Sequence, residues 1–422
     1  MIIRNEWWVI KDTELEKHKQ KIQEEIVRYI AQYDCSSDDE IYEAIEQKVI
    51  ETGYSVFFSA EEKRYIVRSV YNSIRGLDIL QDILENPEIT EIMVNGYDHI
   101  FIEQKGRITE YPKHFESVEK LEDVIQLIVA KVNRMVNEAN PIVDVRLMDG
   151  SRVNIVLPPV ALNGPIVTIR KFPDKPITMK ELIKIGSITV DAMNFLKTLV
   201  VARYNIFISG GTGSGKTTFL NALSNYIPSD ERIITIEDSA ELQIRGIPNL
   251  VKLEVRNANV EGKNAITIRD LLKSALRMRP DRIILGEVRD AAACELMSCM
   301  NTGHDGSLST GHANSTLDML HRLETLVLMG MDIPLPAVRS QIASAIDIVV
   351  QLGRLRDKSR KVLEIAEVIG IEDGEIKVQS LYKFVEEGED ADGKISGRLL
   401  PTGNRLVHRD KLIHAGLSVG ME

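Results

Sequence analysis

A glycine-rich stretch ending in Lys-Thr carries the clearest chemical signal in this sequence. It fits G-x-x-x-x-G-K-[ST], a pattern whose glycines let backbone N–H groups curl around phosphate oxygens. Lys216 can reach the outer phosphates of a nucleotide, and the Thr217 hydroxyl can ligate Mg²⁺. We therefore predict a binding loop for ATP and Mg²⁺, formed by Gly210, Gly211, Thr212, Gly213, Ser214, Gly215, Lys216, Thr217 and Thr218.

The flanks of this stretch favour the same interpretation. An apolar run of β type covers 204–209, and good helix-forming residues follow in 218–223. The loop thus falls between a strand and a helix, and a helix that opens near Lys216 points its positive end at the bound anion.

Acidic residues follow two other predicted strands of the same region. Glu237 and Asp238 end one strand, and Glu287 follows another. Ligands of doubly wound sheets bind at the carboxyl ends of the strands, so these acids can orient the attacking water or hold the metal. The usual Walker B aspartate is replaced by Gly286, so Glu287 must orient water, bind metal through water, or do both. Strand-end acids also cap helices or simply face solvent, and both alternatives stay open.

A polar, glycine-rich segment at 303–314 contains two of the eight histidines, His304 and His312. A neutral imidazole can sense the γ-phosphate or position a water, although a histidine in such a loop can equally be structural. A zinc site would need two further ligands at suitable spacing, and no cysteine pair supplies them.

Arginines gather in two places. Those around the strand before Glu287 can pair with local acids, whereas two on a separate predicted domain are candidates for stabilising the charge on a transferred phosphate. The first group is Arg277, Arg279, Arg282 and Arg289, and the second is Arg152 and Arg170.

Composition narrows the class of protein. The net charge of −11 and the aromatic content of 5% argue against a nucleic-acid coat and a base-stacking platform. Three cysteines, Cys35, Cys294 and Cys299, form no disulfide framework, which fits a reducing compartment. Without a signal peptide or a long apolar run, we expect a cytoplasmic protein that reaches the membrane only through partners.

The chain of 422 residues divides by pattern into a helical extension, an α+β domain, a linker, a domain of alternating strands and helices, and a terminal hairpin with a tail. The fold class is therefore α/β, with a parallel-rich sheet in the larger domain. The predicted bounds are 1–75, 76–172, 173–180, 181–370 and 371–422.

Four blocks in order resemble the type II/type IV secretion ATPases. They are the glycine-rich loop, Arg232–Glu241, Arg279–Asp290 and Gly303–Ser315, which match that family's Walker A, Asp box, atypical Walker B and His box. Three further blocks, Thr90–Gly96, Asp149–Asn154 and Thr168–Phe172, resemble the CpaF-like ATPases that assemble tight-adherence (Tad) pili. The only departure we note is Met148, where that branch usually has proline.

The resemblance implies a homo-hexameric ring of RecA-like domains on the cytoplasmic side of a membrane complex, with an inner-membrane platform protein as partner. ATP would bind between the α+β domain and the RecA-like domain. Glu287 would be the catalytic carboxylate, with Glu237 and Asp238 as the Asp box and His312 near the γ-phosphate. By the same resemblance, Arg152 and Arg170 would reach the nucleotide from the α+β domain.

Several functions remain in competition. The main prediction is the ATP-hydrolysing motor of Tad-type pilus assembly, which converts interdomain closure around a ring into movement of a membrane platform. The alternatives are a type IV secretion ATPase for effector or DNA transfer, a RecA-like nucleic-acid translocase, a small-molecule kinase and a scaffold that only binds nucleotide. The low pI and the few aromatics weigh against the translocase, so we expect no direct nucleic-acid contact and no membrane insertion.

Overall fold

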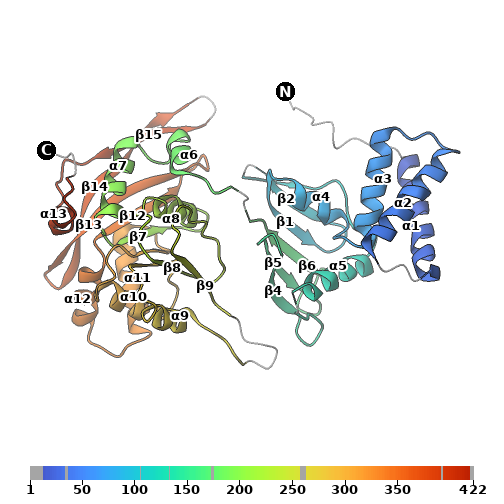
Figure 1. Ribbon diagram of the computed structural model, residues 1–422. Helices are drawn as coiled ribbons and strands as arrows, with labels where there is room; N and C mark the ends of the chain where they lie inside the picture. The colour runs from blue at the N-terminus through green and yellow to red at the C-terminus, as the bar shows by residue number, and fades with distance from the viewer. Residues whose placement is uncertain are drawn as a thin grey trace. The chain divides into compact units, whose positions relative to one another are not determined.

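The computed structural model divides the chain into two compact units, Met1–Asp174 and Lys175–Glu422 (Figure 1). Cys35 and the first two residues of the predicted linker lie outside the part of the chain that it describes. The described residues are 13–33, 37–104, 106–132, 134–172, 175–256, 263–390 and 393–418.

The first unit begins with a bundle of three helices, as the spacing of its isoleucines and valines predicts. They are α1 (Thr13–Tyr33), α2 (Asp38–Gly53) and α3 (Ala60–Ile74). Ser37 and Ser59 open α2 and α3 with capping boxes, in which each serine and a glutamate three residues later satisfy the free N–H groups of the first turn. The bundle has an apolar core of its own, which includes Ile22, Ile45 and Ile66.

An antiparallel sheet follows in the same unit. Its strands lie in the order β3-β2-β1-β6-β5-β4, and α5 packs apolar side chains such as Ile125 and Ile128 into the core beside it (Figure 1). The elements are α4 (Ile79–Glu85), β1 (Ile89–Asn95), β2 (Ile100–Gln104), β3 (Arg107–Glu110), α5 (Val118–Ala130), β4 (Ile142–Arg146), β5 (Arg152–Val156) and β6 (Ile166–Arg170).

The second unit is built on one long sheet of order β15-β14-β13-β12-β7-β11-β10-β8-β9, in which the strands from β12 to β9 run parallel. This is the parallel-rich α/β sheet that the alternating pattern predicts. Its parallel strands are β7 (Ile206–Gly210), β8 (Ile233–Glu237), β9 (Leu250–Glu254), β10 (Arg282–Leu285), β11 (Leu308–Gly311) and β12 (Ile348–Arg354).

Helices cover both faces of this sheet and bury two apolar layers. One layer includes Phe195 and Leu220, and the other includes Leu296 and Leu323. The helices are α6 (Met179–Lys184), α7 (Val190–Val201), α8 (Lys216–Ser224), α9 (Ile268–Ala275), α10 (Ala293–Met300), α11 (Thr316–Leu328), α12 (Leu335–Ala345) and α13 (Asp410–His414).

The predicted terminal hairpin is larger than its apolar runs suggest. The strands β13 (Arg360–Glu372), β14 (Glu375–Glu389) and β15 (Ile395–Pro401) are antiparallel and continue the sheet from β12. No break in the sheet therefore falls at residue 370 within the described residues, and α6 already begins at Met179, inside the predicted linker.

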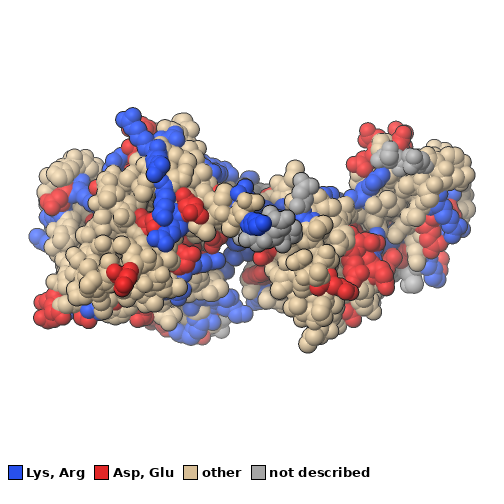
Figure 2. Space-filling model, turned by 90° about the horizontal axis from the view of Figure 1, so that it is seen from below, with Lys and Arg blue, Asp and Glu red and all other residues tan. Residues whose placement is uncertain are grey.

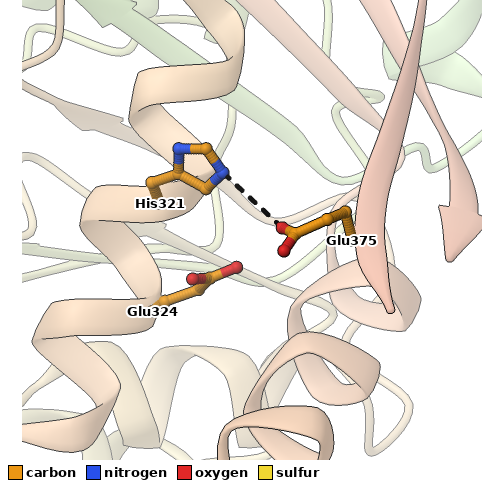
Figure 3. Close-up of side chains that lie close together, drawn as sticks. All are labelled: His321, Glu324 and Glu375. Atoms are coloured by element: carbon orange, nitrogen blue, oxygen red, sulfur yellow. Dashed lines mark ion pairs between the residues drawn. The ribbon is translucent and has the colours of Figure 1, made fainter. Parts of the chain in front are cut away.

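Three side chains in this unit offer possible metal ligands within 4.8 Å of one another: His321 and Glu324 of α11 and Glu375 of β14 (Figure 3). Arg339 of α12 already donates to Glu324 Oε1 at 3.0 Å and pairs with Glu375 Oε1 at 2.8 Å. Because a guanidinium supplies the positive charge, we interpret the cluster as an ion-pair network that ties α11, α12 and β14 together.

Arg282, the first residue of β10, is fully buried and anchors the sheet. Its Nη2 donates to Glu231 Oε1 at 2.8 Å, and its Nη1 donates to the Val200 carbonyl at 2.6 Å. Arg282 is therefore a structural residue that pairs with a buried acid.

We expect Arg282→Met to lower the free energy of unfolding by about 3 kcal/mol, because Glu231 loses its main partner in a buried site. Urea unfolding followed by circular dichroism measures the change. Arg356→Met is the control, since Arg356 pairs with Glu386 on the exposed surface, where ion pairs contribute little. Equal unfolding midpoints for the two variants would contradict the structural role of Arg282.

Candidate functional site

The glycine-rich loop connects β7 to α8 at the carboxyl edge of the parallel strands. Gly213 and Gly215 have φ angles of +71° and +93°, a region that glycine enters at little cost. At Gly210 a Cβ atom would lie 2.6 Å from the Leu352 carbonyl oxygen of the neighbouring β12, so a side chain is excluded there. Glycine is thus required at the start of the loop by close contact with β12, and it is favoured near the end of the loop by positive φ angles.

Lys216 lies at the first position of α8 with only 7% of its surface exposed. Its Nζ donates to the carbonyl oxygens of Gly210 and Gly211 at 3.0 Å each, and it lies 3.3 Å from His312 Nδ1. Burial lowers the pKa of Lys216, while the nearby Glu287 acts in the opposite direction. All three N–H donors of the ammonium group therefore have partners within the site.

His312 directly follows β11 and links Lys216 to Glu287. Because an ammonium group can only donate, Nδ1 of His312 is the acceptor and the ring proton resides on Nε2. That Nε2 lies 3.2 Å from Glu287 Oε1. Burial and the charge of Lys216 lower the pKa of His312, which fits a neutral ring in this position.

Glu287 lies just beyond β10, with its carboxylate held by Arg289. Arg289 Nε donates to Oε1 at 2.9 Å, and Arg289 Nη2 donates to Oε2 at 3.1 Å. Burial raises the pKa of Glu287, but the hydrogen bond and charge of Arg289, with the charges of His312 and Lys216, outweigh it and lower the pKa. Glu287 is thus an ionised carboxylate at neutral pH.

Glu237 is the last residue of β8 and Asp238 follows it, and the two acids differ in their surroundings. Glu237 is 3% exposed, and its Oε1 accepts from the backbone N–H groups of Glu241 and Leu242 at 2.9 Å each. Burial raises the pKa of Glu237 to about 7. Asp238 is more exposed, and its Oδ2 lies 3.3 Å from Arg289 Nη1. Glu237 therefore fastens the loop that follows it, and Asp238 joins the site through Arg289.

The replacement of the usual Walker B aspartate by Gly286 has a steric reason. A Cβ atom at Gly286 would lie 3.0 Å from Glu237 Cγ. The side chain of Glu237 thus occupies the space beside the end of β10, and any larger residue at position 286 would have to push it aside by a few tenths of an ångström.

Arg152 and Arg170 belong to the other unit, Met1–Asp174. They lie opposite each other on β5 and β6, and Arg146 of β4 lies opposite Arg152 in turn. The three arginines thus form a row across the ends of three neighbouring strands, β4, β5 and β6. Their approach to a nucleotide stays a prediction.

Two arginines of the second unit contact the site although the sequence does not assign them to it. The sequence indicates Arg289 as one of four arginines near β10 that can pair with local acids, but it does not identify Glu287 as its partner. Arg360 of β13 donates from Nε to the Gly213 carbonyl at 2.9 Å, and no local signal marks it because it lies far along the chain. His304 precedes β11, so that strand separates it from His312.

Comparison with known proteins shows the family of this chain. A model of the family described as type II/IV secretion system protein matches residues 74–396. The chain belongs to this family. The chain is therefore an ATPase, and membership of this family implies that it binds nucleotide.

Relatives of this secretion family match over most of their own length. A putative conjugal transfer protein of Mycobacterium tuberculosis is 34% identical over 306 residues, which is 71% of this chain and 86% of the relative. The type IV secretion system protein VirB11 of Bartonella henselae is 32% identical, covering 68% and 91%. Conjugal transfer protein TrbB of Rhizobium radiobacter is 32% identical, covering 76% and 96%.

Solved structures of similar proteins include the VirB11 ATPase of Brucella suis, at 30% identity, with 68% of this chain and 92% of that chain covered and a TM-score of 0.39. The ATPase DotB of Legionella pneumophila has 21% identity, with 67% of this chain and 78% of that chain covered, and a TM-score of 0.49.

Among the described residues, no helix is both long and apolar enough to cross a membrane.

We expect Gly286→Ala to reduce the ATPase kcat by about tenfold, because the new methyl group displaces Glu237 and the end of β10 beside Glu287. Steady-state phosphate release measures the change. In a Glu237→Ala background the same substitution should cost little further, since the clashing side chain is gone. A full tenfold loss in both backgrounds would show that the contact with Glu237 is not the cause.

Proposed function

We propose that this chain is the ATP-hydrolysing motor of a type IV secretion or conjugal transfer machine. The observation that carries the proposal is the connected set of Lys216, His312 and Glu287 at the glycine-rich loop, in a chain whose relatives are named for conjugal transfer and type IV secretion. Hydrolysis needs a phosphate grip, a metal and an oriented water, and this edge of the sheet offers groups for each.

In the proposed mechanism the loop N–H groups and Lys216 bind the phosphates of MgATP, and the Thr217 hydroxyl ligates the Mg²⁺ ion that accompanies the substrate. Glu287 accepts a hydrogen bond from the attacking water and orients it toward the γ-phosphorus. Glu287 would also bind the metal indirectly, through a water molecule. His312 lies between Lys216 and Glu287, so it is placed to respond to the γ-phosphate.

Motion follows if the two units close around the nucleotide. Arg152 and Arg170 would then approach the phosphates from the antiparallel sheet, and hydrolysis would release them. We propose that copies of the chain form a homo-hexameric ring on the cytoplasmic side of the membrane. Successive closures around that ring would move an inner-membrane platform protein.

Tad-type pilus assembly is the second candidate. It is favoured by the blocks Thr90–Gly96, Asp149–Asn154 and Thr168–Phe172, whereas the printed names of the relatives favour type IV secretion. Deleting the gene in the source cell separates the two. Loss of DNA or effector transfer with intact surface filaments supports the first, and loss of filaments alone supports the second.

A nucleic-acid translocase fits less well. The net charge is −11, and acidic side chains gather on the face of the N-terminal unit shown in Figure 2. Such a surface repels a phosphate backbone. A marked increase of the ATPase rate with single-stranded or duplex DNA would reverse this preference.

We expect Lys216→Ala to lower the rate of ATP hydrolysis by at least about 100-fold. The variant loses the lysine of the loop, and with it the positive charge that would stabilise the outer phosphates. Phosphate release at saturating MgATP measures the effect, and circular dichroism confirms that the variant is folded. Hydrolysis near the wild-type rate in the folded variant would remove Lys216 from the mechanism.

Glu287→Gln should keep nucleotide affinity and lower kcat by about 100- to 1,000-fold, because an amide of the same shape no longer accepts the water proton. Binding of a fluorescent ATP analogue and single-turnover hydrolysis measure the two properties separately. A turnover rate close to wild type would exclude Glu287 as the water-orienting group.

A further inference from the structure

Arg289 grips the carboxylate of Glu287 and also contacts Asp238. Two of its nitrogens donate to the two oxygens of Glu287, at 2.9 and 3.1 Å. A third nitrogen, Nη1, lies 3.3 Å from Asp238 Oδ2. One planar guanidinium thus joins Glu287, two residues beyond β10, to Asp238, directly after β8. Its fork restricts the orientation of the Glu287 carboxylate as a lysine could not.

The contacts of Arg289 fix the direction of the acceptor positions on Glu287. Its Oε1 accepts from Arg289 Nε, and His312 Nε2 lies 3.2 Å from the same oxygen. Its Oε2 accepts from Arg289 Nη2, and among the described contacts one lone pair of Oε2 stays open. A water can therefore donate to Oε2, and the fork of Arg289 determines where that lone pair points.

A purely structural role for Arg289 is weaker than this positioning role. The side chain is 56% exposed, and ion pairs at such exposure contribute little to the free energy of unfolding. Its N–H groups converge on two acids of the candidate site rather than on buried backbone. The contacts are therefore suited to fixing an orientation more than to holding the fold.

We propose that Arg289 is the positioning residue of this ATPase, which aims Glu287 at the attacking water and couples that aim to Asp238 at the end of β8. The proposal rests on the proposed role of Glu287 in hydrolysis. Arg289 acts through Glu287 and is not itself assigned a contact with the substrate.

Arg289→Lys tests the fork while keeping the charge. We expect kcat to fall about tenfold or more with KM for MgATP changed less than about twofold, because chemistry is misaligned while the phosphate grip is intact. Arg356→Lys is the matched control. Arg356, between β12 and β13, donates to both carboxylate oxygens of Glu386 on β14, at 2.9 and 2.6 Å. Loss of that fork should leave kcat unchanged. A wild-type kcat for Arg289→Lys would overturn the proposal, and so would a rise in KM that accounts for the whole loss.

Chemical rescue distinguishes positioning from folding. Arg289→Ala should recover a saturable part of its kcat when ethylguanidinium is added, whereas ethylammonium should restore less because it lacks the fork. The same additive should do nothing for Glu287→Gln. Equal rescue by both cations, or no rescue of a folded variant, would contradict the geometry proposed for Arg289.

The two proposals fail differently. If the wild-type chain at assembly-competent concentration releases no phosphate from MgATP, the hydrolytic function itself fails. If the wild type hydrolyses ATP and Glu287→Gln stalls, but Arg289→Lys matches wild type, only the positioning role fails. Asp238→Asn adds a graded check, with a kcat between those of wild type and Arg289→Lys if the coupling to β8 holds.

Discussion

The site depends on one topological constraint: strands that lie far apart in the sequence are neighbours in the parallel sheet and end at one edge. In the order β7-β11-β10-β8, the strand ends place Lys216, His312, Glu287 and Glu237 in sequence along that edge. The hydrogen bonds between such side chains act over a short range, because donor and acceptor atoms must lie about 3 Å apart. A shift in strand order or register would separate them, so the buried apolar layers on both faces of the sheet are a condition of the chemistry.

Much of this edge was predictable because its signals are local. The loop is recognised from glycine spacing beside an apolar run, and Glu287 and Glu237 are recognised as acids that follow such runs. The rule that ligands meet the carboxyl ends of parallel strands then joins these pieces without knowledge of the strand order. The helical start of the chain and the antiparallel sheet followed in the same way from periodicity and turn residues.

The remainder depended on contacts that no local pattern encodes. The partner of Arg289 could be any nearby acid, because exposed arginines adopt many rotamers and only the backbone after β10 directs this one to Glu287. The sequence predicts Glu237 as a possible metal ligand, but it does not indicate that its Oε1 accepts from the backbone N–H groups of 241 and 242. The sequence does not predict the third antiparallel strand, β15, because edge strands with one polar face lack a strong apolar signal.

The contacts of Lys216 bear on how nucleotide binding and catalysis are coupled. Its three donors engage two loop carbonyls and His312, so a phosphate that binds Lys216 must replace at least one of these bonds. If the bond to His312 is the one replaced, Nδ1 loses its donor while Nε2 still faces Glu287. In the proposed mechanism, the imidazole of His312 thus connects the charge of Lys216, which would bind the phosphate, to the carboxylate of Glu287, which would orient the water. Because Lys216 is buried, its attraction to an incoming anion is screened less than it would be at an exposed lysine.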